Sequence, residues 1–139
     1  MHSRFAGFLS CVMMAGLLAG CGAKSDRLPV HGQITLDGAP LPTGTIAFTG
    51  PDGSAVAAGN IQDGKYTVSE SGSRRGIPPG TYNILITSWL ETPGEELPGG
   101  GFSKGKSAIP EKYSNPKTSG FTADIQPDKV EFNYELTSK

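Results

Sequence analysis

The feature that most constrains the fold is an alternation of apolar and polar residues, repeated in short runs from residue 30 to the end of the chain. It is clearest in residues 130–137 (VEFNYELT). A period of two places successive side chains on opposite faces of a β-strand, so one face of each run can be buried. Outside the first 20 residues, apolar residues do not recur at the spacing of an amphipathic helix. The pattern predicts an all-β domain.

Turn-forming residues separate these runs. Asp37-Gly38 and Asp63-Gly64 are typical of tight hairpins, and residues 50–53 (GPDG) combine a proline that presets φ with glycines that accept positive φ. Seven short strands separated by such turns are typical of an immunoglobulin-like β-sandwich. In the third strand, Val56 and Ala58 are expected to face inward. The predicted strands are residues 30–36, 44–49, 55–60, 65–69, 81–89, 121–125 and 130–136.

The first 20 residues have the layout of a secretory signal peptide. A short positive start is followed by an apolar run over residues 5–19, which is shorter than the roughly 20 residues needed to cross a bilayer. Residues 18–21 (LAGC) resemble the lipobox of bacterial lipoproteins. This resemblance implies cleavage before Cys21, a diacylglycerol on its sulfur and an acyl chain on its new amine. The alternative is an ordinary signal peptide that leaves Cys21 as a free thiol.

A lipid on Cys21 would make a membrane the first partner of the chain. Two or three acyl chains hold a protein to a bilayer durably, whereas one chain binds reversibly. The residue after the cysteine is Gly22 rather than an aspartate, and by the same resemblance this favours the outer over the inner membrane of the cell envelope. We therefore expect an exported, membrane-anchored protein with a signal peptide (1–20), a lipidated tether (21–27) and a β-sandwich domain (28–139).

Several motifs of this domain resemble the carboxypeptidase regulatory-like, or transthyretin-like, domain. The resemblance is closest to small bacterial lipoproteins that consist of one such domain. It implies a transthyretin-like (prealbumin-like) sandwich, no peptidase activity because a separate domain supplies catalysis in those enzymes, and a tyrosine corner in which Tyr82 bonds back to the preceding backbone. The motifs are residues 30–34 (VHGQI), 36–41 (LDGAPL), 44–48 (GTIAF), 63–68 (DGKYTV), 79–82 (PGTY) and 109–113 (IPEKY).

The sequence offers few residues for catalysis. Cys11 leaves with the signal peptide and lipid modifies Cys21, so we expect no disulfide, thiolate zinc site or cysteine nucleophile. His31 is the other candidate, and it is expected on the outward face of the first strand without partners for a catalytic base. A net charge of −1 without a polybasic run argues against nucleic acid as a partner. The prediction is a non-catalytic structural or binding module without metal or cofactor.

Residues 90–119 form a long stretch without a clear period, with three consecutive glycines at 99–101. A loop of this length inside a compact domain is uncommon and is either functional or mobile. Acidic residues concentrate in its first part and lysines in its second, so one interpretation is a loop that folds back on itself. The other is a binding site for a protein or polysaccharide of the envelope, with Trp89, Phe102 and Tyr113 as aromatic anchors.

An alternative function remains open at this stage. Asp37, Asp52 and Asp63 each precede a glycine, and turn chemistry alone explains that pattern. If two of these turns converged at one end of the domain, their oxygens could bind calcium. A small metal-dependent hydrolase acting through residues 90–119 belongs to the same alternative.

Overall fold

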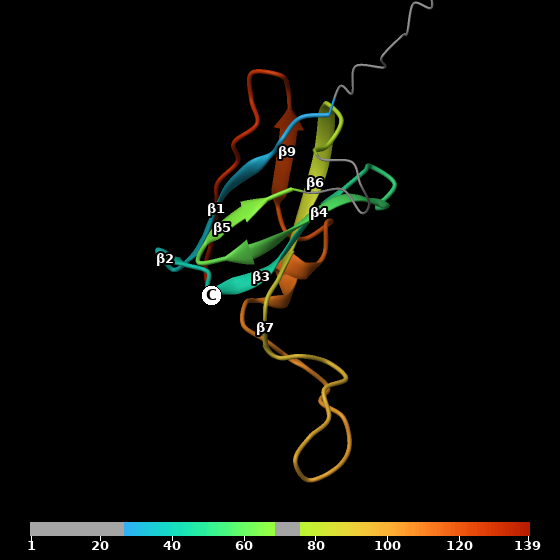
Figure 1. Ribbon diagram of the computed structural model, residues 1–139, viewed down its shortest axis with the longest axis vertical. Helices are drawn as coiled ribbons and strands as arrows, with labels where there is room; N and C mark the ends of the chain where they lie inside the picture. Colours follow the sequence, from blue (N-terminus) through green and yellow to red (C-terminus); the bar gives the residue numbers. More distant parts are fainter. Residues whose placement is uncertain (1–26, 69–75) are drawn as a thin grey trace, which may run out of the picture.

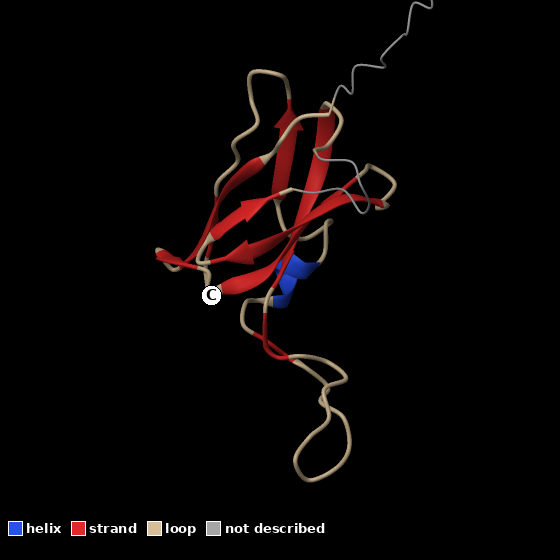
Figure 2. Ribbon diagram, in the orientation of Figure 1, coloured by secondary structure: helices blue, strands red, loops and turns tan. Residues whose placement is uncertain are grey.

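The computed structural model describes residues 27–68 and 76–139, and there the chain consists of β-strands and one short 3-10 helix (Figures 1 and 2). The signal peptide, the lipidation site at Cys21 and most of the tether lie outside the described residues. No described helix is long and apolar enough to span a membrane. The elements are β1 (His31–Leu36), β2 (Ala39–Pro40), β3 (Thr43–Thr49), β4 (Ala55–Gln62), β5 (Lys65–Thr67), β6 (Gly80–Thr87), β7 (Trp89–Glu91), β8 (Lys106–Ser107), η1 (Glu111–Ser114), β9 (Phe121–Ile125) and β10 (Tyr134–Leu136).

Eight of the strands form one curled sheet in the order β10-β1-β5-β4-β3-β6-β9, with β2 paired to β1. Neighbours are antiparallel except β1 and β10, which are parallel. β7 and β8 form a separate two-stranded sheet. The all-β prediction is confirmed, and each of the seven predicted runs overlaps a strand. One hydrogen-bonded path links the strands because β1 pairs with β5 through its first half and with β10 through its second.

Two hairpins follow directly from the Asp-Gly pairs. Asp37 and Gly38 have φ of 50° and 85°, and Asp63 and Gly64 have φ of 50° and 76°. Positive φ at both central residues is the type I′ geometry, whose twist matches that of the flanking strands. The first pair joins β1 to β2 and the second joins β4 to β5. The turn predictions are therefore confirmed at both positions.

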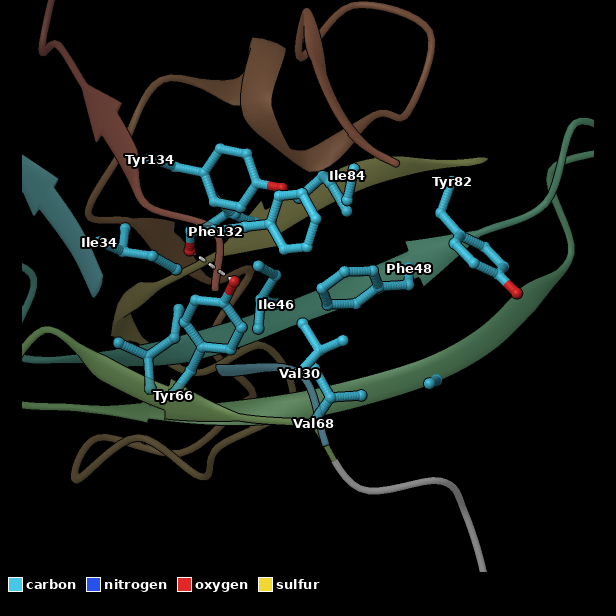
Figure 3. Packing of buried hydrophobic residues seen from close by; sticks show 14 of the residues in the cluster. Val30, Ile34, Ile46, Phe48, Tyr66, Val68, Tyr82, Ile84, Phe132 and Tyr134 are labelled. Carbon is cyan, nitrogen blue, oxygen red and sulfur yellow. Dashed lines mark hydrogen bonds between the residues drawn. The ribbon is translucent and has the colours of Figure 1, made fainter. Parts of the chain in front are cut away.

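The core lies inside the curl of the sheet, where apolar side chains from β1, β3, β5 and β6 meet those of residues 132–136 (Figure 3). The Phe48 ring lies between Tyr66 and Tyr82, with centroid separations of 6.5 and 6.4 Å. Burial raises the pKa of the Tyr66 phenol, which remains protonated and donates a hydrogen bond to the Phe132 carbonyl (2.7 Å). Gly32 of β1 lets the backbone at residue 132 come close, because a Cβ at position 32 would lie 1.8 Å from the Phe132 carbonyl oxygen.

The predicted inward face of the third run is wrong. Ala57, Gly59 and Ile61 of β4 are buried, whereas Ala58 is exposed and Val56 is half-buried. The partner strand sets this phase, because Ala57 lies opposite Phe48 and Gly59 opposite Ile46, and directly opposed side chains share a face. A Cβ on Gly59 would lie 2.6 Å from the Thr67 oxygen, so glycine is required at this position of the inner face.

Aromatic side chains join the two ends of the curled sheet. Phe121 of β9 lies 5.1 Å from the ring of Tyr134 of β10, and the Tyr134 hydroxyl donates to the Thr122 carbonyl (3.3 Å). Tyr113, from the segment before β9, also stacks on Phe121, at 5.5 Å. Residues from the end of the chain and from the 90–119 stretch thus close the sheet into its curl.

Candidate functional site

The stretch that the sequence marks as unusual divides into two parts. Residues 89–107, here called the arm, leave the end of β6 and project away from the curled sheet, and residues 108–120, here called the return segment, pass back along it through η1 (Figures 1 and 2). The boundary is anchored at Ser88, whose hydroxyl donates to the Thr43 carbonyl (2.7 Å) and whose own carbonyl accepts from the Ala108 amide (2.8 Å). These bonds fix the base of the arm to the β3 side of the sheet.

The arm is a hairpin rather than the irregular stretch that the sequence predicts. β7 pairs with β8, with Leu90 as an extra residue between the paired positions Trp89–Ser107 and Glu91–Lys106. Further out, the two sides remain connected by backbone hydrogen bonds from Gly94 to Ser103 (2.9 Å), from Ser103 to Glu95 (2.8 Å) and from Leu97 to Gly101 (3.0 Å). Two glycines with positive φ, at 100 and 101, turn the chain at the tip. The sequence conceals this hairpin because glycine and proline interrupt any alternation.

The arm carries every large apolar side chain that the structure exposes among its described residues. The exposed fractions are 44% for Trp89, 66% for Leu90, 43% for Leu97 and 72% for Phe102. Single exposed apolar residues are ordinary on a protein surface, but the confinement of all four to one projecting element makes the arm a candidate interaction site. Two of the predicted aromatic anchors, Trp89 and Phe102, are therefore exposed on the arm, as a binding role would require.

Tyr113, the third predicted anchor, is not part of this surface. It lies in η1, is 5% exposed, and stacks almost parallel to Phe121. Its hydroxyl accepts a hydrogen bond from the Thr137 amide (3.0 Å). The structure therefore corrects the prediction of Tyr113 as a partner-binding residue. Its ring is buried in the core, so Trp89, Phe102 and Tyr113 do not form one site.

Sequence reasoning missed Leu90 and Leu97. Both are aliphatic residues close to the prolines and glycines of residues 92–101, which hide any alternation in the sequence, although Leu90 itself lies in β7. A large apolar residue in such a segment is the one signal that could have identified them. Together with Phe102 they extend the apolar surface from the base of the arm to its tip.

The three Asp-Gly carboxylates act as turn residues. Asp37 accepts from the Ser138 amide (3.1 Å), and Asp52 accepts from the Ser54 hydroxyl (2.7 Å). The side chain and then the amide of Ser138 hold the pKa of the Asp37 carboxyl below its usual value, and those of Ser54 do the same for Asp52. The Asp37 and Asp63 turns neighbour one another around Pro40, whereas Asp52 follows the far end of β3. Within residues 27–68 and 76–139, no group of three His, Cys, Asp or Glu side chains is placed to hold a metal ion.

Two other places carry titratable groups: His31, which forms a backbone bridge with Glu131, and a hollow along β4 and β5. His31 is exposed on β1, as predicted, and a ring nitrogen lies 3.3 Å from the Pro29 carbonyl. An open hollow of about 940 Å³ lies along β4 and β5, lined by residues 55–60, 62, 63 and 65–67. Its charged residues are Asp63 and Lys65. Neither place assembles a nucleophile with a base, so the arm is the strongest candidate site in the described structure.

Comparison of the chain with models of known protein families, with curated proteins and with solved structures found no match.

Proposed function

We propose that this chain is a lipid-anchored lipoprotein of the bacterial cell envelope whose β-domain is a non-catalytic binding module. Lipid on Cys21 would hold it to a membrane, with Gly22 favouring the outer one, and the arm would contact a partner. The observation that carries the binding role is the gathering of Trp89, Leu90, Leu97 and Phe102 on one projecting hairpin. An isolated two-stranded hairpin is marginally stable in water, so a second molecule that covers these side chains would also stabilise the arm.

Two features support assigning the domain to the carboxypeptidase regulatory-like, or transthyretin-like, type with an immunoglobulin-like arrangement. The Tyr82 hydroxyl donates to the Pro78 carbonyl (3.0 Å), which is the bond expected of a tyrosine corner. The strands also enclose a single core between opposed faces of the curled sheet, as the layers of a sandwich do. In this proposal the domain supplies a rigid base, and the arm supplies the specificity.

The anchoring half of the proposal is tested by mass spectrometry of the full chain extracted from envelopes with detergent. We expect a mature N-terminus at Cys21 that carries diacylglycerol, and release of the protein from membranes in the Cys21→Ser variant. An unmodified thiol or an N-terminus elsewhere would contradict it. The Gly22→Asp variant tests the sorting step, since it should move the protein from outer to inner membrane fractions.

The binding half is tested by the size of the detergent-extracted particle. We expect the full chain to sediment as part of a complex larger than one copy in its detergent micelle. The double variant Leu97→Ser/Phe102→Ser should sediment as the lone protein, with unchanged denaturation. The matched control replaces two exposed body residues, Thr122→Ser and Glu135→Gln, and should leave the complex intact. Equal sedimentation of all three proteins would reject the arm as a binding element.

A further inference from the structure

The tip of the arm combines apolar and acidic side chains and no basic ones. Residues 94–103 (GEELPGGGFS) contain Glu95 and Glu96 but no lysine, arginine or histidine. Glu96 and Phe102 are bridged across the hairpin, so a carboxylate and the most exposed ring of the arm stand side by side on one face. Leu97, the next residue along, adds an aliphatic side chain to this tip.

The base of the arm is electrically different. Glu91 pairs there with Lys106 across β7 and β8, and Lys104 lies between this pair and the tip. Charges at the base are therefore of both signs, whereas the tip is purely acidic. A surface complementary to the tip needs an apolar pocket for Phe102 and Leu97, surrounded by positive charge that faces Glu95 and Glu96.

The arm and the start of the described chain lie at opposite ends of β6 (Figure 1). Leu28 pairs with Ile77 just before β6 begins, and the arm starts directly after β6 ends. Eight residues of strand separate these ends by about 25 Å. Six residues of sequence, 22–27, lie between Cys21 and Leu28, so in the proposed anchored protein the arm starts from the end of β6 opposite to the anchor.

These observations distinguish between classes of partner. A lipid surface fits poorly, because the tip carries two carboxylates, which anionic headgroups repel, and points away from the anchor. A polysaccharide fits poorly, because Phe102 is the tip's one aromatic ring and its neighbour is aliphatic. A second copy of the chain fits poorly, because the described body outside the arm exposes no large apolar side chain to meet the tip, and two tips in contact would bring like-charged carboxylates together.

We propose that the tip of the arm, Glu95, Glu96, Leu97 and Phe102, docks into an apolar pocket with a basic rim on another protein. This inference rests on the proposed function, and it adds the chemical class of the partner and the residues that select it. Phe102 and Leu97 supply the buried contact, while Glu95 and Glu96 steer the encounter and fix its orientation.

The test is site-specific photocrosslinking of the full chain in the cells that produce it. The photoreactive residue p-benzoyl-phenylalanine replaces Phe102 in one variant and Leu97 in a second, and a matched control carries it at exposed Thr122 on β9. We expect a protease-sensitive adduct from both arm positions and none from position 122. Mass spectrometry should place the crosslinked peptide in a different protein, at apolar residues flanked by lysine or arginine.

The charge of the tip is tested with the same crosslinker at Phe102 and the added changes Glu95→Gln and Glu96→Gln. We expect the adduct yield to fall roughly fivefold, as it should for the original tip when salt is raised to about 0.5 M. An adduct with lipid, with glycan or with a second copy would overturn the partner class while leaving the arm as a binding element. A yield insensitive to both charge and salt would overturn the basic rim, and no adduct at all would reject the proposed function as well.

Discussion

The arm and the return segment are consecutive in sequence and opposite in their use of apolar residues. The arm exposes four large apolar side chains, whereas the return segment buries Ile109 and Tyr113 against the curled sheet. The arm is a hairpin and the return segment contains the short helix η1, but neither kind of structure by itself decides which side chains are buried. The difference lies in what each part touches: the return segment crosses the ends of the sheet at β9 and β10, and the arm extends beyond it. One insertion thus both completes the core and presents a surface.

The largest expected effect distinguishes the two parts by a single aromatic residue. Tyr113→Ala should lower the free energy of unfolding by about 3–4 kcal/mol, because it removes a buried ring stacked on Phe121 and leaves a cavity. Phe102→Ala should change it by less than about 0.5 kcal/mol, because that ring is 72% exposed. Urea denaturation of residues 21–139 carrying Cys21→Ser measures both. Equal effects would remove the distinction between the arm and the return segment.

A conservative variant shows which part of Tyr113 matters. Tyr113→Phe keeps the stack but loses the hydroxyl that accepts from the Thr137 amide. We expect a loss of about 1 kcal/mol, the usual net value of one hydrogen bond. A loss as large as that of Tyr113→Ala would mean that the bond to the C-terminal segment, rather than packing on Phe121, fixes the return segment.

The sequence alone predicted the strands and their turns, but it did not predict the division into the arm and the return segment. Alternation is a local signal, and it located all seven main strands, whereas the Tyr82 bond was expected from the resemblance to a tyrosine corner. The phase of β4 depends on its register with β3, which one small-residue run cannot specify. The burial of Tyr113 likewise depends on Phe121 and Thr137, eight and 24 residues further along the chain. Local patterns therefore identify elements, while contacts between distant residues decide which aromatic residues remain exposed.

A smaller effect compares two buried serines, one in each part. The Ser119 hydroxyl donates to the Ile84 carbonyl of β6, so Ser119→Ala leaves a buried acceptor without its partner and should cost about 1–2 kcal/mol. The Ser103 hydroxyl accepts from the Gly105 amide within the arm (3.0 Å), so this bond does not involve the curled sheet. Ser103→Ala should therefore cost less than about 0.5 kcal/mol in the same denaturation measurement. A larger cost for Ser103 would indicate that the arm and the body unfold together.

The smallest effect is expected from removing most of the arm. Glu91 and Lys106 already face each other across β7 and β8, so an Asn-Gly turn can replace residues 92–105 and close a two-residue hairpin. The free energy of unfolding should remain within about 1 kcal/mol, since loop length enters only logarithmically and the removed side chains contribute little to the core. The same variant should lose the partner complex because Leu97 and Phe102 are gone. A drop of several kcal/mol would instead show that the arm supports the sheet, and its exposed apolar residues would then need a structural rather than a binding explanation.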